Sequence, residues 1–332
     1  MPMVPGGRVI GLDISGTFGG GMRGALVDVA GSLISRKEAV TPRISQEDLI
    51  GNLVTMASRL ADQAQRENAP AAAVGIAVPG LINEASGMVL RSPNLPLQEV
   101  PLGRILQDRL RIPVFLTKDA SAGAIGEYAL GAGRLVSDMM LVLIGNGVGS
   151  AVVNEGRILR GVHGTAGEIG HIVIDPAGIV CGCGGRGCVE TFASVTSIAR
   201  RYTMAAKEAI LAEEVVAKAE AGNPAAVRVW SDALGALATV IATAVAVIDC
   251  ELVVLSGTMK LSAEALRPLE ALLAKRINLV QLPRVEVGVL GETAGVLGAA
   301  AIAFERAGLG DAAQEWRRSG QLPGGHSISR LA

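Results

Sequence analysis

Short apolar runs that end in glycine or a polar residue alternate along the chain with longer segments of helical period. Runs of this length, bounded by turn residues, are typical of strands buried on both faces of a sheet. The glycine-rich segment SGTFGGG follows the first run, and Pro79 and Gly80 close the third. In the first part of the chain we therefore expect strands at residues 8–14, 25–29, 73–78 and 113–117.

Helices are expected between these runs. Ser45 suits the N-cap position, and the apolar residues behind it recur mostly three or four positions apart. Residues 102–110 and 121–130 also have helical composition. The apolar positions of the first expected helix are Leu49, Ile50, Leu53, Met56 and Leu60.

The order of strand, glycine loop and strand occurs again about 130 residues later, at residues 139–144, GNGVGS and residues 151–153. The repetition of this order of elements predicts two lobes, and strands alternating with helices predict α/β architecture. Downstream we expect helices at 194–248 and 293–307 and strands at 251–255 and 285–290. From Gly308 onward no apolar period is visible, which predicts a loose tail.

The length and net charge of the chain limit the classes of function that fit it. A chain of 332 residues exceeds one ordinary core, in agreement with two lobes. The net charge of -1 and eight aromatic residues give no basic stripe or stacking platform, which argues against a nucleic-acid partner and favours a small polar ligand or a nucleotide. The longest uncharged run, residues 233–248, is shorter than the roughly 20 residues of a membrane span, so we expect a buried helix. The N-terminal residues show no secretory signal, and a cytoplasmic protein is expected.

Three of the four cysteines lie within eight positions of one another, behind a histidine, in the spacing H-x9-C-x-C-x4-C. Three thiolates and one imidazole form the four-ligand set that zinc favours in closed, structural sites. The alternative, three reduced core cysteines, does not fit their glycine-rich surroundings. The expected zinc ligands are His171, Cys181, Cys183 and Cys188.

The two glycine loops are candidates for binding phosphate, because backbone N–H groups can approach an anion closely where no Cβ intervenes. The alternative is a pair of ordinary tight hairpins, for which Gly and Asn are common residues. The candidate residues are Asp13, Gly16 and Thr17 around the first loop and Asn146, Gly147 and Gly149 in the second.

Carboxylates supply the remaining candidate chemistry. Asp119 follows a buried strand, so it is either a helix N-cap or a base that takes a proton from a hydroxyl group. Its neighbour Lys118 could pair with a carboxylate, reach a ligand or extend outward. Glu168 and Glu190 flank the cysteine cluster together with His171, and carboxylates held by a rigid knuckle suit the binding of sugar hydroxyls.

These motifs together resemble the ROK family of sugar kinases and related repressors, over roughly residues 9–307. GLDISGT resembles the first phosphate loop, LTKDASAGAIGE the catalytic segment and LIGNGVGS the second phosphate loop. AGEIGH and CGCGGRGCVE are the most specific match. VPGLINEASGMVLRSPNLP resembles the sugar-binding segment, and VVLSGTMK the segment that meets the adenosine.

The resemblance implies a role for each candidate. Asp119 would be the general base, and Gly257 would lie at the adenosine. The sugar contacts would be Asn94, Lys118, Asp119, Glu168, His171 and Glu190. The fold would be the two-lobed actin-like, ribonuclease-H-like ATPase fold with a central cleft, in which residues 1–118 and 296–318 form the small lobe, residues 119–295 the large lobe, and residues 319–332 a loose tail.

The activity implied is ATP-dependent phosphorylation of a sugar hydroxyl, with Mg²⁺ at the phosphates, structural Zn²⁺ and a homodimeric state. Family repressors carry an N-terminal DNA-reading domain, and Asp13 lies too close to the start of this sequence for one, which favours the kinase branch. Five positions depart from the family pattern: Ser15, Phe18, Lys118, Ser121 and Asn146. They leave two alternatives open, namely a kinase for an amino sugar, N-acyl sugar or cyclitol, and a sugar-sensing protein without catalysis.

Overall fold

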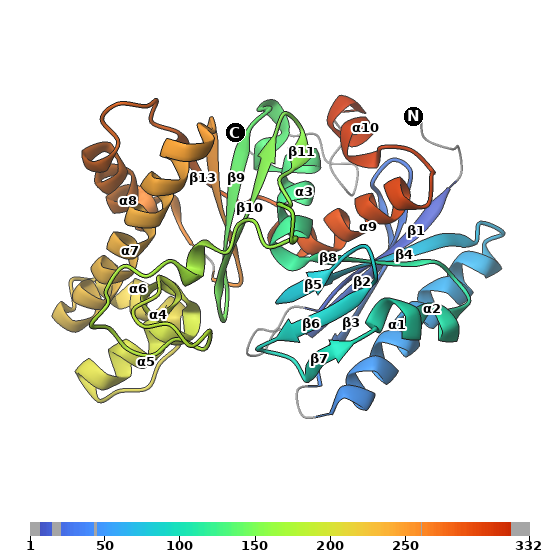
Figure 1. Ribbon diagram of the computed structural model, residues 1–332, viewed down its shortest axis with the longest axis horizontal. Helices are drawn as coiled ribbons and strands as arrows, with labels where there is room; N and C mark the ends of the chain where they lie inside the picture. Colours follow the sequence, from blue (N-terminus) through green and yellow to red (C-terminus); the bar gives the residue numbers. More distant parts are fainter. Residues whose placement is uncertain (1–6, 15–20, 43–44, 260, 320–332) are drawn as a thin grey trace. The chain divides into compact units, whose positions relative to one another are not determined.

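The computed structural model describes residues 7–14, 21–42, 45–259 and 261–319, and the chain forms two compact units (Figure 1). Unit 1 comprises Met1–Leu135, Gly156–Ala166 and Val289–Ala332, and unit 2 comprises Val136–Glu155 and Gly167–Gly288. Residues 119–135, which we expected in the large lobe, belong to unit 1, because the helix that begins at Asp119 packs against the helix Ala294–Arg306 within that unit.

Unit 1 is built on a five-stranded sheet in the order β3-β2-β1-β4-β8. Strands β1, β4 and β8 run parallel, whereas β2 and β3 are antiparallel to their neighbours, and the ends of the parallel strands therefore meet at one edge. Side chains alternate between its faces: Val9 enters one apolar core and Ile10 the other. The strands are β1 (Arg8–Asp13), β2 (Gly21–Asp28), β3 (Leu33–Val40), β4 (Ala71–Val78) and β8 (Val114–Lys118).

Helices cover both faces of this sheet. The helix α1 (Gln46–Arg66) lies on one face beside α2 (Leu102–Leu110), with Ser45 as the N-cap that the sequence predicts. The other face packs against α3 (Asp119–Leu130) and α9 (Ala294–Arg306), which Figure 1 shows on the opposite side of the strands from α1. A three-stranded sheet of β5 (Leu81–Asn83), β6 (Met88–Ser92) and β7 (Leu97–Val100) also belongs to unit 1.

Two glycines let α9 approach the sheet closely. A Cβ at Gly11 would lie 2.2 Å from the Val296 carbonyl oxygen, and one at Gly75 would lie 1.9 Å from that of Ala299. Backbone-to-backbone packing at this distance excludes every other residue type from both positions. The sheet of the N-terminal segment is thus completed by a helix from near the C-terminus.

The segment after Gly308 corrects one expectation. Instead of a loose tail, residues 312–319 form the helix α10, because Trp316 supplies a single large anchor that periodicity does not reveal. Its side chain is fully buried, meets Phe304 edge-to-face at 6.2 Å, and donates a hydrogen bond of 2.9 Å to the Val29 carbonyl. The rest of the expected tail, residues 320–332, lies outside the described residues.

Unit 2 contains a second sheet, in which β10, β9, β12 and β13 are neighbours in that order. β9 and β10 are antiparallel, and β12 runs parallel to β9 and β13. The strands are β9 (Met139–Ile144), β10 (Val148–Asn154), β12 (Leu252–Gly257) and β13 (Arg284–Val287), and the short β11 covers Arg157–Ile158. The helices are α4 (Glu190–Ala193), α5 (Val195–Ala206), α6 (Ala212–Glu220), α7 (Pro224–Ile248) and α8 (Ala263–Arg276), with a turn of 3₁₀ helix at η2 (Ile169–His171). The residues of β11 and of two further 3₁₀ turns, η1 (Ala132–Leu135) and η3 (Gly291–Thr293), belong to unit 1.

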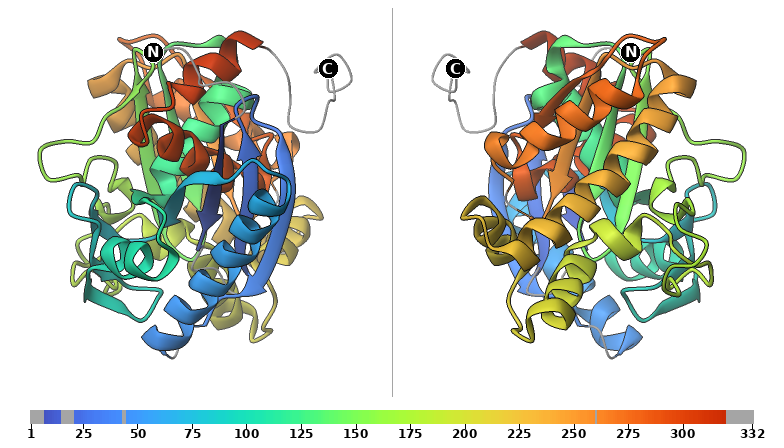
Figure 2. Two further views of the ribbon diagram at one scale, coloured as in Figure 1. Left: turned by 90° about the vertical axis from the view of Figure 1, so that its right-hand side faces the viewer. Right: turned by 90° about the vertical axis from the view of Figure 1, so that its left-hand side faces the viewer.

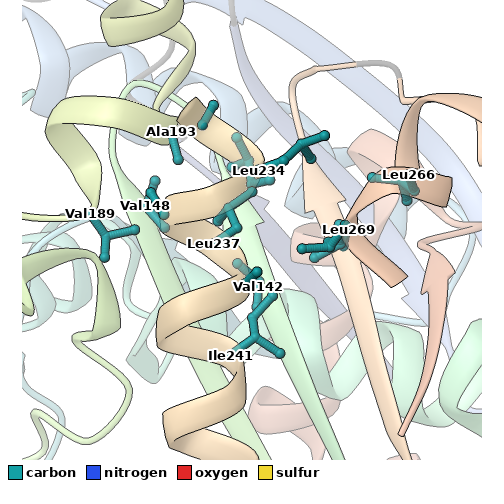
Figure 3. Close-up of a cluster of buried hydrophobic side chains, with 14 of the residues drawn as sticks. Val142, Val148, Val189, Ala193, Leu234, Leu237, Ile241, Leu266 and Leu269 are labelled. Carbon is teal, nitrogen blue, oxygen red and sulfur yellow. The ribbon is translucent and has the colours of Figure 1, made fainter. Parts of the chain in front are cut away.

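The helix α7 is long and apolar enough to cross a membrane by length and composition, yet one of its faces is buried in the core of unit 2. Leu234, Leu237 and Ile241 point from this helix toward Val142 of β9 (Figure 3). The right-hand view of Figure 2 shows the helices α7 and α8, coloured yellow-orange to orange, packed along the strands of unit 2. The helix that the uncharged run predicts is thus present, with one face buried in the core and the other exposed.

Candidate functional site

The carboxyl ends of the parallel strands in unit 1 carry two of the predicted residues. β1 ends at Asp13, and β8 ends at Lys118, after which α3 begins directly at Asp119. Because parallel strands end at the same edge of a sheet, the polar residues that follow them gather there. Asp13 pairs with Ala77 and Lys118 with Val78, so the ends of β1 and β8 lie on either side of β4. The charge of Asp119 accordingly contributes to raising the pKa of Asp13.

Asp13 is almost completely buried, and its Oδ1 has no hydrogen-bond partner among the described residues. Burial, together with the charges of Asp119 and Glu292, raises the pKa of Asp13 to about 7, and the charge of Arg23 opposes this rise. Arg23 and Glu292 form an ion pair of 2.7 Å beside it. Gly295, at the start of α9, leaves room for the carboxylate, since a Cβ there would lie 2.5 Å from Oδ2. An orphaned buried carboxylate oxygen of this kind suits a nearby cation.

Asp119 is half-buried, and its Oδ1 accepts a hydrogen bond of 2.8 Å from the backbone N–H of Ala120. Lys118, not Asp119, occupies the N-cap position of α3, so the first of the two expected roles does not apply. Asp119 is the first residue of the helix, where the free N–H groups favour a negative charge. Lys118 is buried, and its Nζ donates a hydrogen bond of 3.2 Å to the Ala166 carbonyl.

The other candidates of unit 1 are placed less completely. Asn94 is exposed in the turn between β6 and β7. Gly16 and Thr17 of the first glycine loop lie outside the described residues, as do the departures Ser15 and Phe18. Ser121 is buried on the first turn of α3.

The second glycine loop, in unit 2, is a tight hairpin between β9 and β10, in which Ile144 pairs with Val148. The Gly145 N–H donates to the Gly147 carbonyl at 2.9 Å, and Asn146 Oδ1 accepts from the Thr196 hydroxyl at 3.4 Å. Gly149 belongs to β10 itself. The hairpin geometry that we gave as the simpler alternative is therefore present, and it leaves phosphate binding by this loop as a prediction.

Gly257 lies beside this hairpin, because β12 pairs with β9 and places Gly257 opposite Ile144. Its φ is +132°, and a Cβ added to it would lie 2.0 Å from the Ile144 carbonyl oxygen, so the position is restricted to glycine. The ends of β9 and β12 are thus held close together, with backbone atoms rather than side chains at the point of contact.

The cysteine cluster gathers as its spacing predicts. The ligand atoms of His171, Cys181, Cys183 and Cys188 lie within 4.8 Å of one another. Two of the separations, His171 Nδ1 to Cys181 Sγ and Cys183 Sγ to Cys188 Sγ, are 3.7 Å. A tetrahedral zinc ion with Zn–S bonds of about 2.3 Å needs sulfur–sulfur separations of about 3.8 Å. The four donors therefore fit zinc in both chemistry and spacing.

Backbone contacts shape the knuckle around these thiols. The Cys181 N–H donates to the Gly185 carbonyl at 2.8 Å, and the Gly185 N–H points at Cys183 Sγ at 3.4 Å. That N–H lowers the pKa of Cys183, whereas burial raises the pKa of Cys181 to about 12 and also raises that of Cys188. A divalent cation is what would keep such buried thiols deprotonated.

The predicted sugar contacts of unit 2 lie beside this cluster. Glu168 precedes η2 and His171 is its last residue, and the His171 N–H donates to the Glu168 carbonyl at 3.1 Å. Glu190 begins α4; its Oε2 accepts from the Val148 N–H at 3.2 Å, and its Oε1 lies 3.5 Å from Cys181 Sγ. Glu190 therefore joins the knuckle to the second glycine loop, a connection that sequence spacing does not reveal.

Sequence reasoning missed three further residues near these sites. Arg23 and Glu292 set the charge around Asp13, and Glu84 accepts hydrogen bonds from Thr117, next to Lys118, and from Arg160. Arg23 and Glu292 lie outside the quoted motifs, Glu84 lies within VPGLINEASGMVLRSPNLP without a distinguishing pattern, and each comes close only through the fold. Isolated charged residues of this kind carry no sequence signal that separates them from solvated surface.

The family model described as "ROK family" matches residues 9–306 of the chain. Among curated relatives, an N-acetylmannosamine kinase of Citrobacter koseri is 35% identical over 89% of this chain and 98% of its own length. A glucokinase of Halalkalibacterium halodurans is 30% identical over 87% of this chain and 92% of its own length. A putative xylose repressor of Caldicellulosiruptor is 30% identical over 89% of this chain and 78% of its own length.

Solved structures agree. A ROK hexokinase from Thermus thermophilus matches with a TM-score of 0.79 and 30% identity, covering 91% of this chain and all of that one. A ROK glucokinase from Streptomyces griseus, in complex with glucose and AMPPNP, matches with a TM-score of 0.78 and 26% identity over 90% of this chain. These matches confirm the two-lobed actin-like fold that the motifs imply.

Proposed function

The chain belongs to the ROK family, and we propose that it transfers the γ-phosphoryl group of ATP to a hydroxyl group of a sugar. The enzyme class is that of a sugar kinase, with an alcohol group as the acceptor. The glucokinase and N-acetylmannosamine kinase relatives support this class, and the structure of a relative with glucose and AMPPNP supports ATP as the donor. The observation that carries the proposal is the pair of carboxylates, Asp13 and Asp119, at one edge of the unit 1 sheet.

In the proposed mechanism Asp119 orients the acceptor hydroxyl and takes its proton as the oxygen attacks the γ-phosphorus in line. The half-buried position of Asp119 suits this role, since a bound sugar can still reach the carboxylate. Glu168, Glu190 and Asn94 would bind and orient the sugar. The backbone around Gly147 and Gly257 would face the nucleotide.

Two ions accompany this proposal. Asp13 is the residue that would hold Mg²⁺, because its buried Oδ1 lacks a partner among the described residues and its charge is poorly solvated. When bound, Mg²⁺ offsets the charge of the phosphates. Zinc at the cysteine cluster would stabilise the knuckle that carries Glu190 and take no part in the reaction.

The decisive variant is Asp119→Asn, which keeps the size of the side chain and removes the base. We expect kcat to fall by about 10²- to 10⁴-fold, the usual contribution of a general base, with sugar affinity and zinc content unchanged. A coupled ADP-release assay, calorimetry of sugar binding and metal analysis measure these three quantities. Turnover near the wild-type value in this variant would remove Asp119 from the mechanism.

The relatives favour two candidate substrates. The 35% identity to an N-acetylmannosamine kinase supports an N-acyl sugar, and the glucokinase relatives support a plain hexose. Lys118 in place of the usual asparagine keeps amino sugars and cyclitols as alternatives. The same ADP-release assay over a panel of hexoses, amino sugars, N-acyl sugars and cyclitols ranks them by kcat/KM, and inorganic polyphosphate in place of ATP tests the donor.

A sugar-sensing protein without catalysis is the second candidate function. The similarity to a putative xylose repressor and the departures at Ser15, Phe18, Lys118, Ser121 and Asn146 favour it. Clear sugar binding by calorimetry without ADP release for any sugar would establish the sensor. We propose a cytoplasmic location, which suits the reduced thiols of the knuckle, and a homodimer, which sedimentation would test.

A further inference from the structure

Residues 156–166, here called the tether segment, belong to unit 1 although the chain on either side of them belongs to unit 2. The segment leads directly into Gly167 and Glu168. The start of the segment forms β11, and its Ile158 packs against an apolar core of unit 1. Leu159 and Val162, nearer the middle, are exposed, so polar contacts must hold the rest of the segment. Two anchors, both connected to the end of β8, supply these contacts.

The first anchor is Lys118. Its side chain is 6% exposed, and its ammonium group donates a hydrogen bond of 3.2 Å to the carbonyl of Ala166, the last residue of the tether segment. A hydrogen bond from an ionised donor is about twice as strong as a neutral one. The Ala166 carbonyl, which accepts this bond in a partly buried position, is therefore firmly placed.

The second anchor is Glu84, which follows β5. Its Oε2 accepts from Arg160 Nε at 2.9 Å, and its Oε1 accepts from the Thr117 hydroxyl at 2.9 Å. Glu84 is 14% exposed and also lies 3.7 Å from Arg306. Neighbouring residues of β8, Thr117 and Lys118, thus hold the two halves of the tether segment, one through Glu84 and the other directly.

The next residue along the chain is held by unit 2. The Gly167 carbonyl accepts from both the backbone N–H and the hydroxyl of Ser150, each at 2.9 Å. Gly167 has a φ of +89°, and a Cβ on it would lie 2.1 Å from the Ser150 carbonyl oxygen. Two consecutive carbonyls, of Ala166 and Gly167, are therefore fixed by different units, and Glu168 follows at once.

We propose that Lys118 is a positioning residue for sugar binding: it fixes the unit 1 end of the tether segment and thereby sets where Glu168 begins. The proposal rests on the proposed function, in which Glu168 contacts the sugar. It replaces a direct contact between Lys118 and the sugar as the reason for a lysine beside Asp119. Glu84 and Arg160 serve the same purpose at the other half of the segment.

Hydrogen exchange tests the anchors without any substrate. The amides of Gly164 and Ala166 are bonded within the segment, to the carbonyls of Gly161 and Arg160, and are protected only while the segment stays in place. In protein free of sugar and nucleotide, Lys118→Met and Arg160→Met should each raise exchange in this segment by about tenfold, the effect of one lost charged hydrogen bond.

Arg157→Met is the matched control for these two variants. It makes the same change as Arg160→Met in the same segment, and within the described part of the chain the Arg157 guanidinium group has no hydrogen-bond or ion-pair partner. Exchange should stay at the wild-type rate in this variant, and exchange in the core of unit 2 should be unchanged in all three. An unaltered segment in both Lys118→Met and Arg160→Met would overturn the proposal.

Sugar kinetics test the consequence. Lys118→Met and Arg160→Met should each raise KM for the preferred sugar by about three- to tenfold with little change in kcat, and the double variant should be no worse than Lys118→Met. Lys118→Arg, which retains a charged donor, should recover most of the loss. If Lys118 instead touches the sugar, Lys118→Met raises KM while Arg160→Met leaves it unchanged, and the proposal fails. If no sugar is phosphorylated, the proposed function fails, whereas the exchange experiment still decides whether the anchors exist.

Discussion

Asp13 shows how burial couples charge to pH at the scale of one residue. Because burial and the neighbouring carboxylates raise the pKa of Asp13 to about 7, the native state keeps a proton that an unfolded chain releases near 4. A native state that binds the extra proton loses stability as pH rises between these two values. The charged form of Asp13 is thus held at a cost to the fold, as is common where a residue serves a ligand.

Asp13→Asn should therefore raise the melting temperature at pH 8 and leave it nearly unchanged at pH 4, while phosphorylation is lost because no carboxylate remains for Mg²⁺. Thermal unfolding at the two pH values and the ADP-release assay measure both effects. Asp108→Asn, a change at an exposed aspartate, is the control and should shift neither. A melting temperature at pH 8 that falls below that of the wild type would contradict the account of Asp13.

Some functional residues could be predicted from the sequence, and others could not. Asp13 and Asp119 could be found from the sequence, because each closes an apolar run, and the four zinc ligands from their spacing. Arg23 and Glu292 could not, because the pairing of β1 with β2 and the approach of α9 bring them to Asp13. A role that depends on distant neighbours leaves no local pattern.

The cysteine knuckle is an element that the metal should hold together, because its backbone forms turns and isolated bridges rather than a regular helix or strand, and its glycines are many. Cys183→Ser should lose zinc on gel filtration and make residues 172–189 sensitive to protease. Cys250→Ala removes a buried thiol outside the cluster and should keep zinc. Metal analysis and limited proteolysis separate the two variants; full zinc content in Cys183→Ser would mean that Cys183 is not a ligand.

Glu127 joins three elements of unit 1 through one buried carboxylate. It lies on α3 and accepts hydrogen bonds from the N–H groups of Ala132, Val289 and Leu290, at 3.0, 3.2 and 2.9 Å. Burial raises its pKa, and the three N–H groups act against that rise. These contacts fix both segments at which the chain leaves unit 1 after Leu135 and returns to it at Val289.

Glu127→Ala should lower the free energy of unfolding by about 3 kcal/mol, because buried N–H groups lose their acceptor. Glu127→Gln should cost less, since the amide oxygen can still accept. Urea unfolding measures both, with Glu315→Gln, a change at a partly exposed side chain of α10, as a control expected to stay within about 0.5 kcal/mol. Equal losses in the alanine and glutamine variants would show that the carboxylate oxygens are not what the backbone needs.

At the scale of the molecule, the spacing of apolar residues and the positions of glycine and proline predicted the α/β class, two lobes and most central strands. They missed the small sheet β5-β6-β7, whose strands are short, and α10, whose main anchor is one tryptophan. They also placed the lobe boundary before Asp119, because the sequence does not show that α3 packs against α9. Long-range packing decided each of these features, and local pattern cannot report it.

Because β1 and β4 pack against α9, the two units complete their cores in a definite order during synthesis. Gly11 and Gly75 leave the ribosome early, but the helix that must lie against them begins only at Ala294. Residues 136–288 can complete their own core while the α9-binding face of the N-terminal strands has α3 against it but still lacks α9. In the nascent chain, unit 2 can therefore fold before unit 1 is complete. A translational stall shortly before Ala294 would leave the α9-binding face of the unit 1 sheet for a chaperone to cover.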